Sequence, residues 1–313
     1  MKENYHHDTE YNSIYLDTDH FSPGYLCALA AYINLNKIKE NDFDTHPNTM
    51  GYLRTLGFHK VLWSIDDSIN RTNAGKSYSP LIPLIHPSEV DTANTTINSC
   101  IRNLVGQQRS EGIADLCKVV GELHDNVWSH GKSTGFSMAQ RTKVPLTNGQ
   151  DHFLEFALAD SGLGFLEELN RARIEINNHE EAIQWCMQEG NSSKLKDSDA
   201  NDWVQRLPED HLGIDPMGCG EQIPENNHQG LGLAHLIKLI KKYKGELLLC
   251  TGDTLFHINS EGIENINKIN NEWKGVTISC RFKESELLKD TNNNILVDTQ
   301  RQYIIDKLRG IKS

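Results

Sequence analysis

The sequence has no apolar run that approaches the ~20 residues needed to span a bilayer, so we expect no membrane segment. The start of the chain, MKENYHHDTEYNS, lacks the apolar stretch of a signal peptide, which predicts a cytoplasmic location. The seven cysteines are scattered and include no CxxC pair. Zinc-ligand spacing is therefore absent, and reduced structural thiols are expected.

Positive charge is also scarce: 31 Lys and Arg stand against 43 Asp and Glu, for a formal net charge of −12. A negative chain repels the phosphate backbone, so this balance disfavours nucleic acid as a partner. The clearest basic cluster, at 238–244, is interpreted as the solvated face of a helix. The P-loop pattern GxxxxGK[ST] and the Rossmann spacing are absent too, which excludes two common nucleotide sites.

Sequence patterning divides the chain into four parts. Residues 1–13 predict a disordered tail, and 284–313 predict a helical extension. Residues 14–98 predict a small α/β domain that ends in an irregular linker from residue 66. Its elements are a strand at SIYLDTD, a helix opened by Ser22 and Pro23, and a second helix leading to a strand in HPNTMGYLRTLGFHKVLW.

The part from 99 to 283 has the strongest periodicity. Apolar residues recur at helical spacing from Ile113 to Val127, and HFLEFALAD alternates as a strand does. An irregular span, 190–229, ends at a glycine turn before a helix, and the strands GELLLCTG and GVTISCRF follow. This order predicts an α/β fold, and a long irregular span inside a compact domain is typical of a functional lid.

The first segment with chemical potential is GELHDNVWSHG, residues 121–131. Glu122 and Asn126 are four residues apart, so a helix places them on one face about a turn apart. Mg²⁺ prefers oxygen ligands, which makes Asn126 a candidate ligand and leaves Glu122 to orient a water or take a proton. His130 is a candidate phosphate contact. Alone, this spacing is typical of surface residues.

The second segment is LADSGLGF, residues 158–165. Asp160 ends an apolar strand, where a carboxylate can accept a hydrogen bond from an adenine amino group. Gly162 and Gly164 follow at a spacing that permits a tight turn and close backbone approach. Alone, the segment is typical of any strand-to-loop turn.

The third segment is QGLGLAHLIKLI, residues 229–240. Gly230, Leu231 and Gly232 precede a helix, and free backbone N–H groups at a helix N-terminus suit phosphate. A single GxG before a helix is weak evidence.

Taken in order, the three segments resemble the N, G1 and G2 boxes of the GHKL (Bergerat-fold, HATPase_c) ATPase superfamily, which includes histidine-kinase catalytic domains, anti-sigma-factor kinases and gyrase B. The resemblance covers about 110–282. It implies a two-layer α/β sandwich, a mixed sheet covered by helices, that binds ATP and Mg²⁺. It also implies Glu122 as general base, Asn126 as Mg²⁺ ligand, Asp160 as the adenine-reading residue, and the G1 and G2 glycines as turn and phosphate contacts.

The resemblance further implies an ATP lid at about 165–229, in which Ser193 and Lys194 are candidate phosphate contacts beside Ser192. One departure concerns the last strand. Many relatives have a threonine directly after its glycine, contacting adenine through water. Here Val276 occupies that place and Thr277 comes next, so either the register shifts to use Thr277 or the contact is missing.

The biological role is left open between two classes. The N-terminal segment is similar to STAS-like segments, which implies a serine/threonine-kinase-like or partner-switching ATPase with a protein partner; alternatively, this segment is an α/β extension packed on the main domain. The second class is an ATP-driven clamp or homodimerisation module, without kinase activity, in a bacterial multi-protein system such as phage defence. A sensor histidine kinase is disfavoured, because no phospho-acceptor histidine lies on a long helical hairpin.

Overall fold

A five-stranded sheet forms the centre of the molecule. The computed structural model describes residues 5–16, 21–66, 71–131, 133–147, 149–191 and 232–289. The sheet order is β4-β5-β6-β8-β7, and every neighbouring pair is antiparallel. The expectation of a mixed sheet is therefore wrong for this sheet. Its strands are β4 (Ile82–Leu84), β5 (Gly135–Lys143), β6 (His152–Asp160), β7 (Glu246–Ile258) and β8 (Glu264–Lys283).

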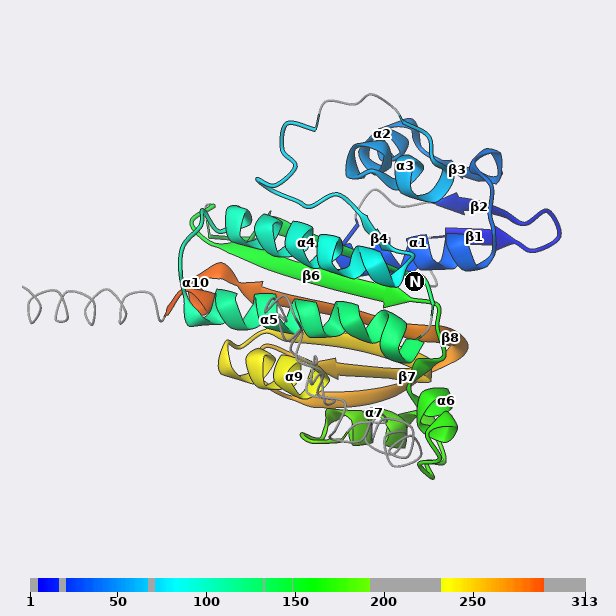
Figure 1. Cartoon of the computed structure of the whole chain (residues 1–313). Coiled ribbons are helices and arrows are strands. Elements are labelled where there is room, and N and C mark those ends of the chain that lie inside the picture. Colours follow the sequence, from blue (N-terminus) through cyan, green and yellow to red (C-terminus); the bar gives the residue numbers. More distant parts are fainter. Residues whose placement is uncertain are drawn as a thin grey trace, which may run out of the picture.

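Three long helices cover one face of this sheet: α4 (Val90–Leu104), α5 (Glu111–Asn126) and α9 (Gly232–Lys242) (Figure 1). The α5 helix begins where the Ser110 hydroxyl accepts a hydrogen bond from the N–H of Ile113 at 3.1 Å. The helical pattern predicted from Ile113 to Val127 is confirmed, and its apolar residues are buried in the core beneath the helices. The strand predicted at HFLEFALAD is confirmed as β6.

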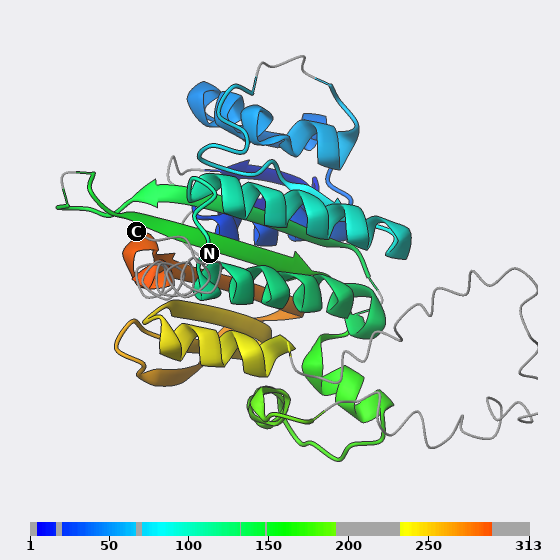
Figure 2. The same ribbon diagram turned by 60° about the vertical axis from the view of Figure 1, so that its left-hand side comes forward.

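The N-terminal part of the chain covers the opposite face of the sheet (Figure 2). The α1 helix is buried on nearly all sides, because it packs on β5, β6 and β8 and shares a core with the small sheet β1-β2-β3. The elements of this part are β1 (Tyr5–Asp8), β2 (Ser13–Leu16), α1 (Pro23–Leu35), the 3₁₀ turn η1 (Glu40–Asp42), β3 (Phe43–Thr45), α2 (Pro47–Leu56) and α3 (Phe58–Trp63).

Both faces of β6 are therefore buried. Leu154, Phe156 and Leu158 point to the face covered by α4, α5 and α9, whereas Ala157 and Ala159 belong to the core around α1. The small alanines allow α1 to approach the sheet, and the Cys27 thiol donates to the carbonyl oxygen of Ala157 at 3.7 Å. The N-terminal elements and the sheet share one continuous core.

Several expectations for the N-terminal part are wrong. Residues 5–8, placed in a disordered tail, form β1 and pair with β2. The strand expected after α2 is instead the helix α3. The expected linker contains β4, the 3₁₀ turn η2 (Pro87–Glu89) and most of α4, so the boundary expected at 98/99 falls inside a helix. Apolar contacts at helical spacing stabilise α4 despite its polar composition.

Two short helices, α6 (Gly164–Arg171) and α7 (His179–Met187), lie beyond the end of β6 and form a small apolar cluster of their own. They belong to the segment expected to be a lid, of which 192–229 lies outside the described residues. The C-terminal extension is described to residue 289 and contains α10 (Glu284–Leu287). In the part of the chain that the structure describes, every helix is too short or too polar to cross a membrane.

Candidate functional site

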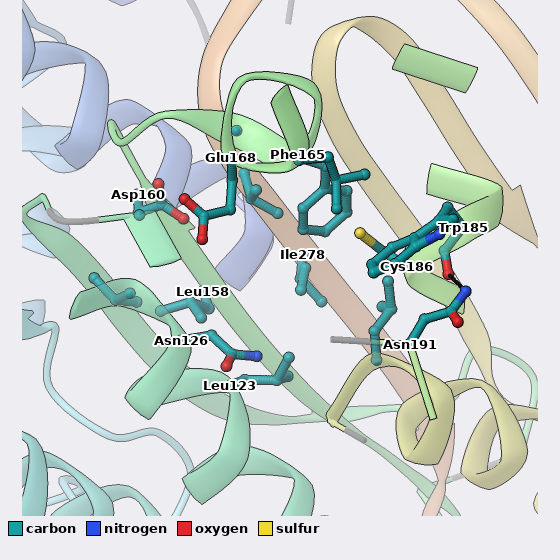
Figure 3. Close-up of a pocket in the computed structure, with 16 residues that line it drawn as sticks. Leu123, Asn126, Leu158, Asp160, Phe165, Glu168, Trp185, Cys186, Asn191 and Ile278 are labelled. Carbon is teal, nitrogen blue, oxygen red and sulfur yellow. Dashed lines mark hydrogen bonds between the residues drawn. The ribbon is translucent and has the colours of Figure 1, made fainter. Parts of the chain in front are cut away.

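A pocket opens where the ends of α5 and β6 and the middle of β8 meet α6, α7 and the start of α9 (Figure 3). Its wall is mainly apolar, and a few polar groups converge on it from different elements. This composition is typical of a small-molecule site. The apolar lining residues are Leu123, Val127, Leu158, Phe165, Leu169, Leu233, Val276 and Ile278, together with Trp185 and Cys186.

Asp160 ends β6 at one side of the pocket and is 5% exposed. Its Oδ1 accepts a hydrogen bond from the N–H of Gly162 at 2.8 Å. Burial raises the pKa of Asp160 to about 7, against the opposing effect of the backbone N–H groups of Gly162 and Val276. A buried carboxyl group with a pKa shifted this far is a functional-site candidate. Because it is buried, it favours a ligand that supplies a hydrogen-bond donor over one that leaves the carboxyl group unpaired.

Three glycines enclose Asp160. A Cβ at Gly275, where φ is +95°, would lie 2.3 Å from the carbonyl oxygen of Asp160. A Cβ at Gly162 would lie 2.3 Å from the carbonyl oxygen of Gly131, and one at Gly131 would lie 3.3 Å from Asp160 Oδ1. Only glycine permits these backbones to approach so closely. The turn after α5, the turn after β6 and the bend in β8 are thus packed around one carboxyl group.

Asn126 is the last residue of α5 and lines the pocket on the same side as Asp160, below it in Figure 3. The chain then makes a π-helical turn, η3 (Val127–Gly131), before it enters β5. Turns of this kind are frequent at functional sites. His130 lies in this turn, and the structure describes its backbone position only.

The start of α9 brings a second group of residues to the same place. A Cβ at Gly232 would lie 3.1 Å from Glu122 Cβ and 3.5 Å from Asn126 Nδ2. The N-terminus of α9 therefore lies against the face of α5 that carries both predicted residues. Glu122 is 8% exposed. Its carboxylate oxygens Oε2 and Oε1 lie 3.1 and 3.3 Å from Nδ1 of His235.

The α6 and α7 side of the pocket was not predicted from the sequence. Glu168 lines the pocket at 5% exposure, and Arg171 binds its carboxylate with two hydrogen bonds of 2.8 and 2.9 Å. Phe165 of the same helix lies beside it, Trp185 of α7 lies further along the pocket, and Asn191 donates to the carbonyl oxygen of Trp185 at 2.9 Å (Figure 3). For Phe165 and Glu168 the available signal was their position just after the glycine turn, and Trp185 and Asn191 had no such signal.

The structure brings most of the described predicted residues together. Asn126, Asp160 and Gly164 line the pocket, Gly162 binds Asp160, and Glu122 and Gly232 meet at its edge. Ser192, Ser193, Lys194, Gly230 and Leu231 lie outside the described residues.

Thr277 is the exception. Val276 and Ile278 line the pocket, so the alternation along β8 turns Thr277 toward the opposite face. Ser279, on that same face, would contact a Cβ at Gly24 of α1 at 2.6 Å. Expecting Thr277 as a pocket contact is therefore wrong, because the strand does not shift its register by one residue.

The basic cluster falls on α9, where three of its lysines have side chains that are about half exposed and contact carboxylates. Lys238 contacts Glu189 at 2.6 Å, Lys241 contacts Glu264 at 2.7 Å, and Lys242 contacts Glu111 at 3.1 Å. Each of these three lysines therefore has an acidic neighbour at the surface.

Comparisons of the chain with protein-family models, with curated proteins and with solved structures found no match. Among the described residues, no cluster of three or more His, Cys, Asp or Glu is placed to hold a metal ion.

Proposed function

We propose that this chain binds ATP with Mg²⁺ in the pocket between α5, β6 and α6, as a member of the GHKL type. The observation that carries the proposal is the buried carboxyl group of Asp160 at one side of an apolar pocket that Asn126 also lines. Apolar walls suit the faces of a purine, and Asp160 can accept a hydrogen bond from its exocyclic amino group.

The polar side of the pocket suits the rest of the molecule. Asn126 has an amide oxygen for Mg²⁺, and a Mg²⁺ ion completes its shell with phosphate oxygens and waters. The N-terminus of α9 lies against Asn126 and Glu122, and helix N-termini favour phosphate through their free N–H groups. A bound Mg²⁺ would neutralise charge on the phosphates. The layer of α4, α5 and α9 over the sheet also agrees with the GHKL sandwich.

In this proposal Glu122 acts as the base. Its carboxylate would take the proton of a water or a substrate hydroxyl as that oxygen attacks the γ-phosphorus and the bond to the β–γ bridging oxygen breaks, releasing ADP. We propose a serine/threonine-kinase-like or partner-switching ATPase as the first candidate. In this candidate the phosphoryl group passes to a hydroxyl of a protein partner.

The second candidate is an ATP-driven clamp, and the shared core favours it. The N-terminal elements pack on the back of the sheet strands that line the pocket, so they form an integral layer. Leu158 lines the pocket, and its neighbours Ala157 and Ala159 contact the α1 side. A nucleotide that shifts β6 would therefore also move the packing of the N-terminal layer, and this change requires no phosphoryl transfer.

Calorimetric titration of ATP, with and without Mg²⁺, tests the pocket. We expect saturable, Mg²⁺-sensitive binding to the wild type and at least tenfold weaker binding to Asp160→Asn, about 1.4 kcal/mol. Asn126→Ala should bind with less dependence on Mg²⁺. Asp44→Asn, an exposed aspartate of β3, is the matched control and should bind as the wild type does. Absence of binding to the wild type would refute the proposal.

The two candidates give different products. Incubation with γ-labelled ATP should yield a labelled protein, either this chain or a partner, if the chain is a kinase. ATP-dependent dimerisation in analytical ultracentrifugation without a labelled protein would favour the clamp. Glu122→Gln should retain ATP binding in either case and lose turnover, because it keeps the shape of the side chain but cannot act as a base.

A further inference from the structure

The contact between Glu122 and His235 joins two helices that are far apart in the sequence. Glu122 is on α5 and His235 is on α9, one turn after the helix begins at Gly232. Nδ1 of His235 lies 3.1 and 3.3 Å from the two carboxylate oxygens. Since a carboxylate only accepts, Nδ1 carries the proton and donates to it.

His235 is the better-held partner of this carboxylate. Its side chain is 24% exposed, and that of Glu122 is 10% exposed. Lys118, on the same helix as Glu122, approaches Oε1 only to 3.9 Å with a side chain that is 66% exposed. An exposed pair at that distance is screened by solvent and contributes little. The imidazole is closer to the carboxylate and better shielded from solvent, so it is the group that fixes the orientation of the carboxylate.

We propose that His235 is a positioning residue for Glu122, a role that rests on the ATP site proposed above. Its Nδ1–H holds the carboxylate in the orientation needed to take a proton. The same helix begins with the glycine that lies against Glu122 and Asn126. The α9 helix would therefore set both the position of a phosphate bound at its start and the orientation of Glu122.

The role requires only a hydrogen-bond donor at the Nδ1 position, with no change in the chemistry of the step. The proton goes from the nucleophile to a Glu122 oxygen, and the imidazole keeps its own proton throughout. An asparagine places its amide N–H₂ near the same point, so His235→Asn should keep the function. An alanine leaves the carboxylate free to rotate, so His235→Ala should lose it.

Steady-state ATP turnover and phosphotransfer test the functional part. We expect His235→Ala to lower kcat about tenfold or more, a part of the roughly 10²–10⁴-fold contribution of general-base catalysis. KM and the calorimetric Kd for ATP should stay near the wild-type values, and His235→Asn should restore most of kcat. In a Glu122→Gln background, His235→Ala should cause no further loss. Lys118→Ala is the matched control and should leave kcat unchanged.

Nitrogen-15 NMR of the imidazoles tests the pairing without nucleotide. We expect the Nδ1–H tautomer for neutral His235 in the wild type and its loss in Glu122→Ala. The Nε2–H tautomer in the wild type would overturn the inference. So would unchanged kcat in His235→Ala, or a loss that persists in the Glu122→Gln background. ATP binding without any turnover would also overturn it, because no base would then operate, while the ATP site itself would stand. Absence of ATP binding would refute the site first.

Discussion

The backbones of Gly131 and Gly162 are in direct contact: a Cβ added to Gly162 would lie 2.3 Å from the carbonyl oxygen of Gly131 and 2.7 Å from its Cα. The N–H of Leu163 donates to the same carbonyl oxygen at 3.3 Å. This contact locks the turn that follows Asn126 to the turn that follows Asp160. Asn126 and Asp160 are therefore held in place relative to each other because two residues without side chains let these turns touch.

A methyl group at Gly162 should destabilise the protein, because the atoms it would meet are backbone and cannot move aside. We expect Gly162→Ala to lower the free energy of unfolding by about 1–3 kcal/mol or more, measured by urea denaturation. Gly51→Ala is the control, since Gly51 lies in α2 with nothing within 4 Å of an added Cβ. That change should be neutral or stabilise by up to about 1 kcal/mol. Equal effects at both positions would contradict the contact.

Protonation of Asp160 should make stability depend on pH. Its folded-state pKa of about 7 lies above the ordinary value of 3.8, so between pH 4 and 7 the folded state keeps a proton that the unfolded state loses. Stability should fall as pH rises through this window and level off above it. Asp160→Asn should lack this component. The difference between wild type and variant in urea midpoints from pH 4 to 8 measures it, and a constant difference would contradict it.

Binding of adenine to Asp160 should release the carboxyl proton of Asp160 below pH 7. The reason is that only the ionised carboxylate can accept hydrogen bonds through both oxygens, from Gly162 and from adenine. Adenosine is a suitable probe, since it has no phosphate that titrates in this range. Calorimetry at pH 6 in buffers of different ionisation enthalpy should detect proton release with the wild type and none with Asp160→Asn. Adenosine affinity should rise as pH increases from 6 to 8. Affinity that stays flat with pH would argue against this contact.

His124 should stabilise the protein only while it is neutral. It is buried between Asn94 Oδ1 at 2.6 Å and Ser137 Oγ at 2.8 Å, and burial lowers its pKa to about 3. The unfolded state gains a proton below the ordinary value of 6.5, so stability should fall as pH drops from 6.5 toward 3. His124→Gln should weaken this dependence. His6→Gln, at an exposed residue of β1, is the control and should leave it unchanged.

Trp185 should report nucleotide binding, because it lines the pocket from α7. We expect ATP to change the intrinsic fluorescence of the wild type and to change that of Trp185→Phe much less. Trp63→Phe is the control, since Trp63 lies in the N-terminal core and donates to the carbonyl oxygen of Ile38 at 2.9 Å. A signal that survives in Trp185→Phe but disappears in Trp63→Phe would place the nucleotide elsewhere.

Local patterns in the sequence predict the elements that carry the pocket. The helical spacing from Ile113 to Val127 and the alternation of HFLEFALAD predict α5 and β6, because each side chain's direction depends only on its own helix or strand. The α4 helix has such a pattern too, at Val90, Ile97 and Ile101, but its Asn, Thr and Ser residues resemble those of a loop. There the burial supplied by the sheet outweighs weak helix propensity.

The sequence by itself determined which residues could act: a glutamate and an asparagine one turn apart, an aspartate at a strand end, and glycines where backbones come close. The tertiary structure alone decided which of them meet. Glu122 and His235 are 113 residues apart, and only the packing of α5 against α9 joins them. Thr277 turns away from the pocket because β8 pairs with β6 in a register that sets Thr277 opposite Ala159, which belongs to the core around α1. Such contacts between distant segments arise from the packing of whole elements, which local spacing does not encode.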